Sequence, residues 1–182
     1  MKLALTHQMR VGHVKRWHMV RVMREQTLGE HLARVQLIAM DVLDEYAKTD
    51  DRLRLQVLQW ALWHDMPEVV TGDVSPPYKS MMREHNYTLA HTIDKSIDER
   101  FETLSRKSNE IAQIVVKFAD LAEAALFLEE EGWGHRAVEI KCELDDSVKS
   151  LIAKTSEEML GDLAEALTVT YRKLINEKSY QT

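Results

Sequence analysis

The sequence of 182 residues is 45% hydrophobic and 30% charged, a composition typical of a globular protein, which excludes disordered and fibrous classes. Its formal charge of −6 argues against a nucleic-acid polymer as partner, because such proteins usually carry a basic face, but it allows a small anionic substrate. The single cysteine, Cys142, excludes an internal disulfide and a thiolate metal cluster. The N-terminus has no apolar run long enough for a signal peptide or a membrane span, so we expect a cytoplasmic protein without membrane contact.

Apolar residues recur with a helical period over most of the chain, and glycine and proline are few, which predicts an all-α protein. The first main helix is expected at about 27–48. Its apolar stripe consists of Leu28, Leu32, Val35, Ala39, Val42 and Leu43. The second is expected between the N-cap candidates at 49–51 and Asp65. Its inward residues are expected to be Leu55, Leu58, Ala61 and Leu62.

The next segment contains several helix breakers, Pro67, Gly72, Pro76 and Pro77, and is predicted to form loops with room for a short turn of helix. Helices are then expected at about 80–104, 108–131, 135–153 and 156–176. The helix at 108–131 is apolar around most of its circumference, which predicts a central position. Together these segments predict one compact domain over residues 1–182, built as a bundle of about six helices.

Four polar residues are candidates for a metal site. His64 and Asp65 follow a strongly apolar helix end, and Asp120 lies in a largely apolar helix where an unpaired charge would be costly. His31 lies on the inward strip of the first helix. A single inward histidine is more often a hydrogen-bonded core residue, but the ordered set of four favours a divalent cation with mixed nitrogen and oxygen ligands.

The order H…HD…D resembles the HD superfamily of metal-dependent phosphohydrolases. The resemblance extends to the YfbR-type 5′-deoxynucleotidases and the small phage HD enzymes that hydrolyse deoxynucleoside triphosphates, and it covers about residues 10–130. It rests on Lys15-Arg16-Trp17, Glu30-His31, the segment HDMPEVVTGD at 64–73, Pro77, Lys79 and Ala119-Asp120. An HDxxE motif followed by TGD is far more specific than an HD dipeptide alone.

The resemblance implies that His31, His64, Asp65 and Asp120 are the metal ligands. The cation would act as the Lewis acid, and the sequence does not distinguish Mn, Co, Zn, Mg or Fe. Glu68 and Asp73 are the implied catalytic carboxylates, with proton transfer or water orientation as their open roles. The other histidines, among them His18, have no ordered ligand spacing and are assigned to the surface or to packing.

Cations flank this acidic cluster. Arg16, Lys79 and Arg83 are candidates for phosphate binding. Trp17 could stack on a nucleobase or ribose and Pro77 could close the other side, although anchoring in the core is a competing use of the Trp17 indole.

The predicted function is metal-dependent hydrolysis of the 5′-phosphate ester of 2′-deoxynucleotides. We favour a dNTP triphosphohydrolase, because Arg83 adds a cation for a longer phosphate tail, and a purine substrate such as dATP, because Trp17 offers a large stacking face. The alternative is a 5′-deoxynucleotidase that releases phosphate from dNMPs. A non-catalytic helical metal-binding or interaction module is a remoter one, and cyclic-dinucleotide cleavage is disfavoured because the chain has HDMPE instead of HDxGK. The resemblance also implies a homo-oligomer.

Overall fold

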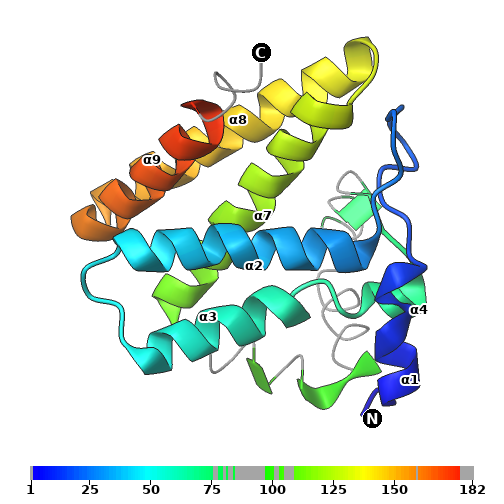
Figure 1. The fold of residues 1–182 in the computed structure, drawn as a ribbon, viewed down its shortest axis with the longest axis horizontal. Helices are drawn as coiled ribbons and strands as arrows, with labels where there is room; N and C mark the ends of the chain where they lie inside the picture. The colour runs from blue at the N-terminus through cyan, green and yellow to red at the C-terminus, as the bar shows by residue number, and fades with distance from the viewer. Residues whose placement is uncertain are drawn as a thin grey trace.

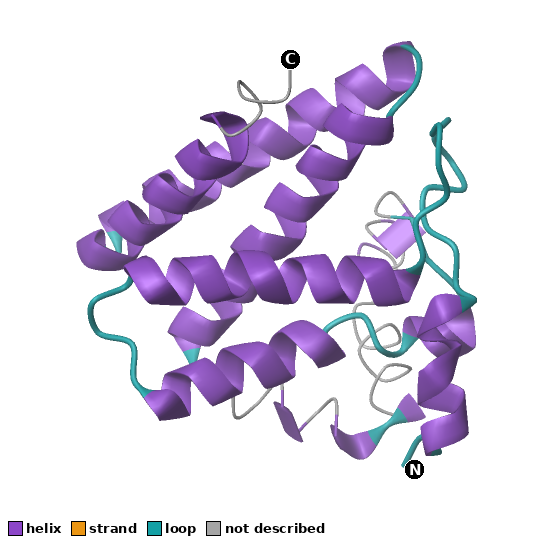
Figure 2. Ribbon diagram, in the orientation of Figure 1, coloured by secondary structure: helices purple, strands orange, loops and turns teal. Residues whose placement is uncertain are grey.

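The computed structural model describes residues 2–75, 78–79, 81, 84, 97–100, 103–104, 109–158 and 160–176. The described residues are mainly helical and contain no β-strand beyond two isolated bridges (Figure 2). The elements are α1 (Leu5–Gln8), the 3-10 helix η1 (Met9–Gly12), α2 (Leu28–Glu45), α3 (Asp51–Trp63), α4 (Glu68–Thr71), α7 (Glu110–Glu131), α8 (His135–Glu157) and α9 (Gly161–Asn176). The all-α prediction is confirmed. The helix predicted at 80–104 lies largely outside the described residues.

Side-chain caps set the starts of the three helices that carry the candidate site. The Thr27 hydroxyl accepts a hydrogen bond from the Glu30 backbone N–H at the start of α2. Asp50 caps α3 in the same way, and Asn109 caps α7. Because each cap satisfies an N–H group that lacks an intrahelical partner, these starts are encoded locally.

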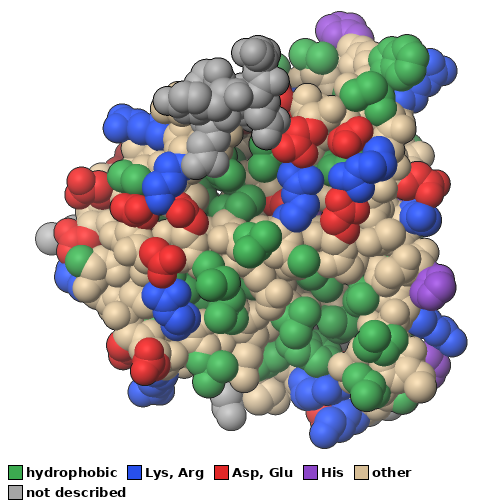
Figure 3. Space-filling view, viewed as in Figure 1, with side chains coloured by type: hydrophobic (Ala, Val, Ile, Leu, Met, Phe, Trp, Pro, Cys, Tyr) green, Lys and Arg blue, Asp and Glu red, His purple; other side chains and the backbone are tan. Residues whose placement is uncertain are grey.

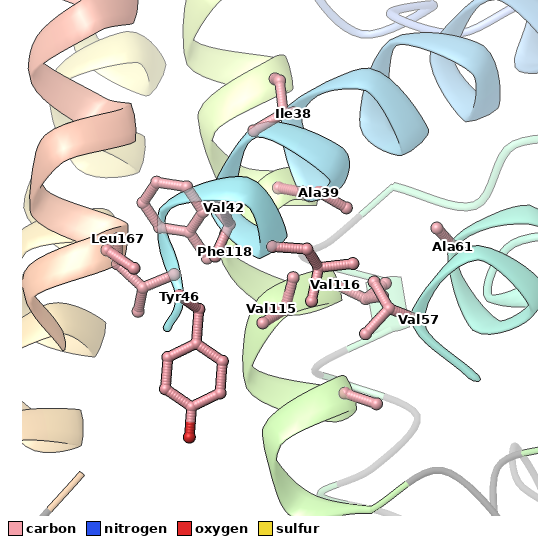
Figure 4. Packing of buried hydrophobic residues seen from close by; sticks show 14 of the residues in the cluster. Ile38, Ala39, Val42, Tyr46, Val57, Ala61, Val115, Val116, Phe118 and Leu167 are labelled. Atoms are coloured by element: carbon pink, nitrogen blue, oxygen red, sulfur yellow. The ribbon is translucent and has the colours of Figure 1, made fainter. Parts of the chain in front are cut away.

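The core lies where α2 and α3 pack on α7, with α8 and α9 against the other side of α7 (Figure 1). Val42 of α2, Phe118 of α7 and Leu167 of α9 meet in this core and are fully buried (Figure 4). The central position predicted for the helix at 108–131 is therefore confirmed. No helix in the described part of the chain is both long and apolar enough to cross a membrane.

The predicted inward face of the second helix was wrong in part. Leu53, Val57 and Ala61 are buried in α3, as is Trp63 at its end, whereas Leu55 is 57% and Leu62 is 40% exposed. Positions 53, 57 and 61 are four residues apart and form one stripe, and Leu55 lies away from it. Figure 3 shows hydrophobic side chains on the molecular face over α2 and α3.

Two helix boundaries also differ from the prediction. The helix predicted to end near residue 153 continues to Glu157, and the next one begins at Gly161 instead of 156. The Thr155 hydroxyl donates to the Leu151 carbonyl inside the helix, so this polar segment continues α8 instead of forming a loop. The short helices α1 and η1 near the N-terminus were not predicted.

Candidate metal centre

The structure brings the four predicted metal ligands together from three helices. His31 lies in the second turn of α2, His64 caps the C-terminal end of α3 and Asp65 follows it, and Asp120 lies in the middle of α7. Each offers one ligand atom, and these atoms all lie within 4.8 Å of one another. His31 Nε2 is 3.5 Å from Asp120 Oδ1 and 3.7 Å from Asp65 Oδ2.

The hydrogen bonds of the two imidazoles suit metal binding. His31 Nδ1 lies 2.6 Å from Glu123 Oε2, and His64 Nδ1 lies 2.7 Å from the Ala61 carbonyl. Both acceptors take a proton from Nδ1, so in the neutral form of each ring Nε2 carries the lone pair. Both Nε2 atoms are buried without a hydrogen-bond partner among the described residues. Two such nitrogens beside two carboxylates fit a borderline or hard divalent cation.

The charges in the cluster favour the same protonation states. Burial lowers the pKa of His64 and keeps its ring neutral. Burial alone would raise the pKa of Asp65, but the neighbouring cations Lys79 and Arg16 hold it well below its usual range. Neutral imidazoles and ionised carboxylates are the forms that bind a metal.

Asp120 is held in the same ionised form from the other side of the cluster. Burial would raise its pKa, yet the ammonium of Lys117, 3.0 Å from Oδ2, contributes most to lowering it. Both carboxylates of the cluster, Asp65 and Asp120, are therefore ionised at neutral pH.

Two of the predicted phosphate-binding cations adjoin the cluster. Arg16 Nη1 lies 3.2 Å from Asp65 Oδ2, and the Lys79 ammonium lies 3.9 Å from Asp65 Oδ1. Lys79 also pairs with Glu68 at 2.7 Å. Cations at these positions can meet a phosphate that approaches the metal centre.

Glu68 lies close to the cluster because the chain keeps turning after α3. Its backbone N–H donates to the Asp65 carbonyl, and Pro67 sits at the N-cap of α4, where its ring is tolerated. Burial, together with the negative charge of Asp65, raises the pKa of Glu68 to about 8 against the opposing effect of Lys79. Its Oε2 is buried with no hydrogen-bond partner in the described part of the chain. Glu68 can therefore hold a proton near neutral pH.

The second predicted carboxylate, Asp73, follows a sharp turn. Gly72 ends α4 with a φ of 76°, a left-handed conformation that favours glycine. Asp73 Oδ2 then lies 3.3 Å from Nδ1 of His18. His18 is 48% exposed at its side chain, as the surface assignment expects, but sequence reasoning missed its contact with Asp73.

The sequence left two uses open for the Trp17 indole, anchoring in the core and stacking on a nucleobase or ribose. Its indole is half-buried, stacks on Phe127 with ring centres 5.8 Å apart and donates from Nε1 to Gln26 Oε1 at 2.8 Å. It also lines a cavity of about 460 Å³ together with Arg16, His18 and other residues. The indole is thus anchored in the protein and still borders this cavity, which Arg16, the ion-pair partner of Asp65, also lines.

Sequence reasoning missed a buried polar network behind the metal centre. Glu123 is fully buried. Its carboxylate accepts hydrogen bonds from His31 and Gln26 and forms an ion pair with Arg34. The available signal was a second acid three positions after Asp120 in an otherwise apolar helix, which places both on one face. The remaining predicted site residues, Pro77 and Arg83, lie outside the described residues.

Comparison with known proteins now assigns the family. Residues 9–132 match the HD domain family. The chain belongs to this family. It is thereby assigned to the metal-dependent hydrolases, as its sequence predicts.

Relatives and a solved structure agree with this assignment. The chain is 30% identical over 141 residues to a dATP triphosphohydrolase of Acinetobacter phage SH-Ab 15497, covering 72% of this chain and 69% of that protein. It is 30% identical over 91 residues to a 5′-deoxynucleotidase of Yersinia pestis (strain Pestoides F), covering 49% and 44%. The structure of the Cyanophage S-2L HD phosphohydrolase DatZ, bound to dA and one catalytic Zn²⁺ ion, matches with a TM-score of 0.86 and 25% identity, covering 97% and 99%.

Proposed function

We propose that this protein is a metal-dependent triphosphohydrolase that converts dATP and water to deoxyadenosine and triphosphate. The observation that carries the proposal is the convergence of two imidazole nitrogens, without a hydrogen-bond partner among the described residues, and two carboxylates beside Arg16 and Lys79. The phage relative named a dATP triphosphohydrolase covers more of the chain than the 5′-deoxynucleotidase, and the DatZ structure holds dA. Both comparisons support dATP as the substrate.

In this proposal His31, His64, Asp65 and Asp120 hold the cation. A divalent cation at this place, for which Zn²⁺ is the first candidate because DatZ binds it, supplies a Lewis acid that stabilises charge on the phosphate oxygens.

Arg16 and Lys79 bind the phosphate, and Arg83 extends this contact along the tail. The Trp17 indole contacts the base, and Pro77 closes the other side of the pocket. In this proposal the bound metal ion and the cationic side chains around it therefore contact successive phosphates of one nucleotide.

Proton transfer is assigned to the two loop carboxylates. Hydrolysis breaks the bond between the 5′ oxygen and the α-phosphorus, and the 5′ oxygen leaves with a proton. Glu68, whose pKa is raised to about 8, holds a proton on Oε2, which has no hydrogen-bond partner within the described residues, and donates it to this oxygen. Asp73, beside His18, orients the attacking water and accepts the proton that this water loses.

The test is a substrate and metal survey with separated products. Metal-stripped protein is incubated with dNTPs, dNMPs and ribonucleotides and with Zn²⁺, Co²⁺, Mn²⁺ or Mg²⁺. We expect deoxyadenosine and triphosphate from dATP. Release of phosphate from dNMPs without attack on dNTPs would establish the 5′-deoxynucleotidase alternative. Absence of both turnover and metal binding would establish the non-catalytic module.

The organisation of the protein completes the proposal. We propose one domain over residues 1–182, a homo-oligomeric assembly and a cytoplasmic location. The exposed apolar side chains of α2 and α3, among them Leu37, Leu55 and Leu62, support a subunit interface. Light scattering coupled to gel filtration measures the mass in solution, and a monomer would contradict the assembly.

A further inference from the structure

A chain of buried hydrogen bonds connects the metal centre to the indole of Trp17. Trp17 Nε1 donates to Gln26 Oε1 at 2.8 Å, and Gln26 Nε2 donates to Glu123 Oε1 at 2.7 Å. The other carboxylate oxygen of Glu123 lies 2.6 Å from His31 Nδ1. Gln26, Glu123 and His31 are fully buried, so water does not replace a bond that is lost.

Only one arrangement of donors satisfies this chain. An indole N–H can only donate, and a carboxylate can only accept. Gln26 must therefore turn its NH₂ group to Glu123 and its oxygen to Trp17. The reversed amide would set NH₂ against the indole N–H and oxygen against the carboxylate. The charge on Glu123, which also pairs with Arg34 at 3.0 Å, thus determines the orientation of Gln26.

Trp17 depends on this support. Its backbone has a φ of 65°, a left-handed conformation that is unfavourable for a bulky residue. Such a conformation persists only where surrounding contacts hold it. For Trp17 these contacts include the turn hydrogen bond from the Val20 N–H to the Trp17 carbonyl at 3.0 Å. The indole itself is held by the parallel stack on Phe127, with 6° between the rings, and by the hydrogen bond to Gln26.

We propose that Gln26 is the positioning residue of the Trp17 indole, and that Glu123 joins it to the metal ligand His31, so that the metal centre and the nucleoside pocket are ordered together. The part of this proposal that concerns nucleoside binding at Trp17 rests on the proposed function. Metal binding at His31 Nε2 makes the Nδ1–H a stronger donor to Glu123, and this change passes through Gln26 to the indole.

The first variant removes the amide and keeps the shape. Gln26→Met breaks both bonds of the relay, and Gln36→Met is the matched control, because the Gln36 amide donates to the Leu58 carbonyl between α2 and α3, away from the site. We expect Gln26→Met to raise the KM for dATP about tenfold while kcat changes less than about threefold. Equal kinetics in Gln26→Met and Gln36→Met would overturn the positioning role.

A second measurement needs no turnover. The indole N–H resonance of Trp17, identified by its loss in Trp17→Phe, is followed while Zn²⁺ is added to metal-stripped protein. We expect the resonance to move in the wild type and in Gln36→Met, and to stay unchanged in Gln26→Met although that variant still binds Zn²⁺. A Trp17 resonance that moves equally in Gln26→Met would overturn the coupling.

Glu123→Gln tests the shared acceptor. Its amide cannot accept from both His31 and Gln26 as the carboxylate does, so we expect Zn²⁺ affinity to fall about 10- to 100-fold and the Trp17 resonance to shift in the same variant. Weaker Zn²⁺ binding with an unchanged Trp17 resonance would overturn the relay. If the resonance results hold but dATP is not hydrolysed, the proposed function fails and the relay stands.

Discussion

His64→Ala should separate the stability of the metal-free protein from its stabilisation by metal. In the metal-free protein the substitution removes a buried Nε2 that has no hydrogen-bond partner in the described chain, but also the bond from Nδ1 to the Ala61 carbonyl. These two effects oppose each other, but the packing of the buried ring is also lost, so we expect the free energy of unfolding without metal to fall by about 1–3 kcal/mol. With metal, the same change removes one of four donors.

The magnitude of the metal effect follows from ligand linkage. Free Zn²⁺ at about 100 times the wild-type dissociation constant stabilises the folded state by about 2.7 kcal/mol. For a chain of this size that raises the melting temperature by about 5–11 °C. If the loss of the His64 imidazole weakens binding about 100-fold, the same Zn²⁺ concentration adds only about 0.4 kcal/mol, or about 1 °C.

The assay is thermal unfolding of chelator-treated protein, followed by circular dichroism with and without buffered Zn²⁺. His135→Ala is the control, because the His135 side chain is 87% exposed at the start of α8. It should retain the full increase in melting temperature. An equal Zn²⁺ response in His64→Ala and the wild type would refute the assignment of this site.

Three further predictions test the surroundings of the cluster. Glu68→Gln should lower kcat for dATP about 10²–10⁴-fold in steady-state assays without lowering the melting temperature, and unchanged kcat would exclude Glu68 as the proton donor. Lys79→Met should lower kcat/KM about 10- to 100-fold, whereas the exposed Lys154→Met should not; similar losses in both would contradict phosphate binding by Lys79. Asp98→Asn should destabilise the protein by about 1–3 kcal/mol in urea unfolding, because buried Asp98 accepts the Leu3 backbone N–H and has a lowered pKa. The difference in free energy of unfolding between the wild type and Asp98→Asn should be largest above about pH 4 and should shrink as the pH falls through the lowered pKa of Asp98. A difference that does not change with pH would contradict this role of the Asp98 carboxylate.

Much of the site was predictable because its signals are local. The types and order of His31, His64, Asp65 and Asp120 predicted a metal site, and the structure brings the four side chains together. Each candidate can be recognised from its own segment, without knowledge of its contacts. His31 lies on an inward helical strip, His64 and Asp65 follow an apolar helix end, and Asp120 lies inside an apolar helix.

Helix formation was likewise encoded in the sequence, through the apolar period and caps such as Thr27 and Asp50. The inward face of α3 was not. Leu55 and Leu62 are as hydrophobic as Leu53, and the packing of α3 against α2 and α7 decides which of them is buried.

Only the tertiary structure decided what lies behind the metal ligands. Gln26 and Glu123 are 97 positions apart, and they meet because α2 lies across α7. A glutamine at a loop and an acid within a helix carry no local signal for each other, since a hydrogen bond depends on distance and direction in space. The sequence therefore determined which chemistry the chain carries, and the crossing of two helices determined how the metal centre and Trp17 are held.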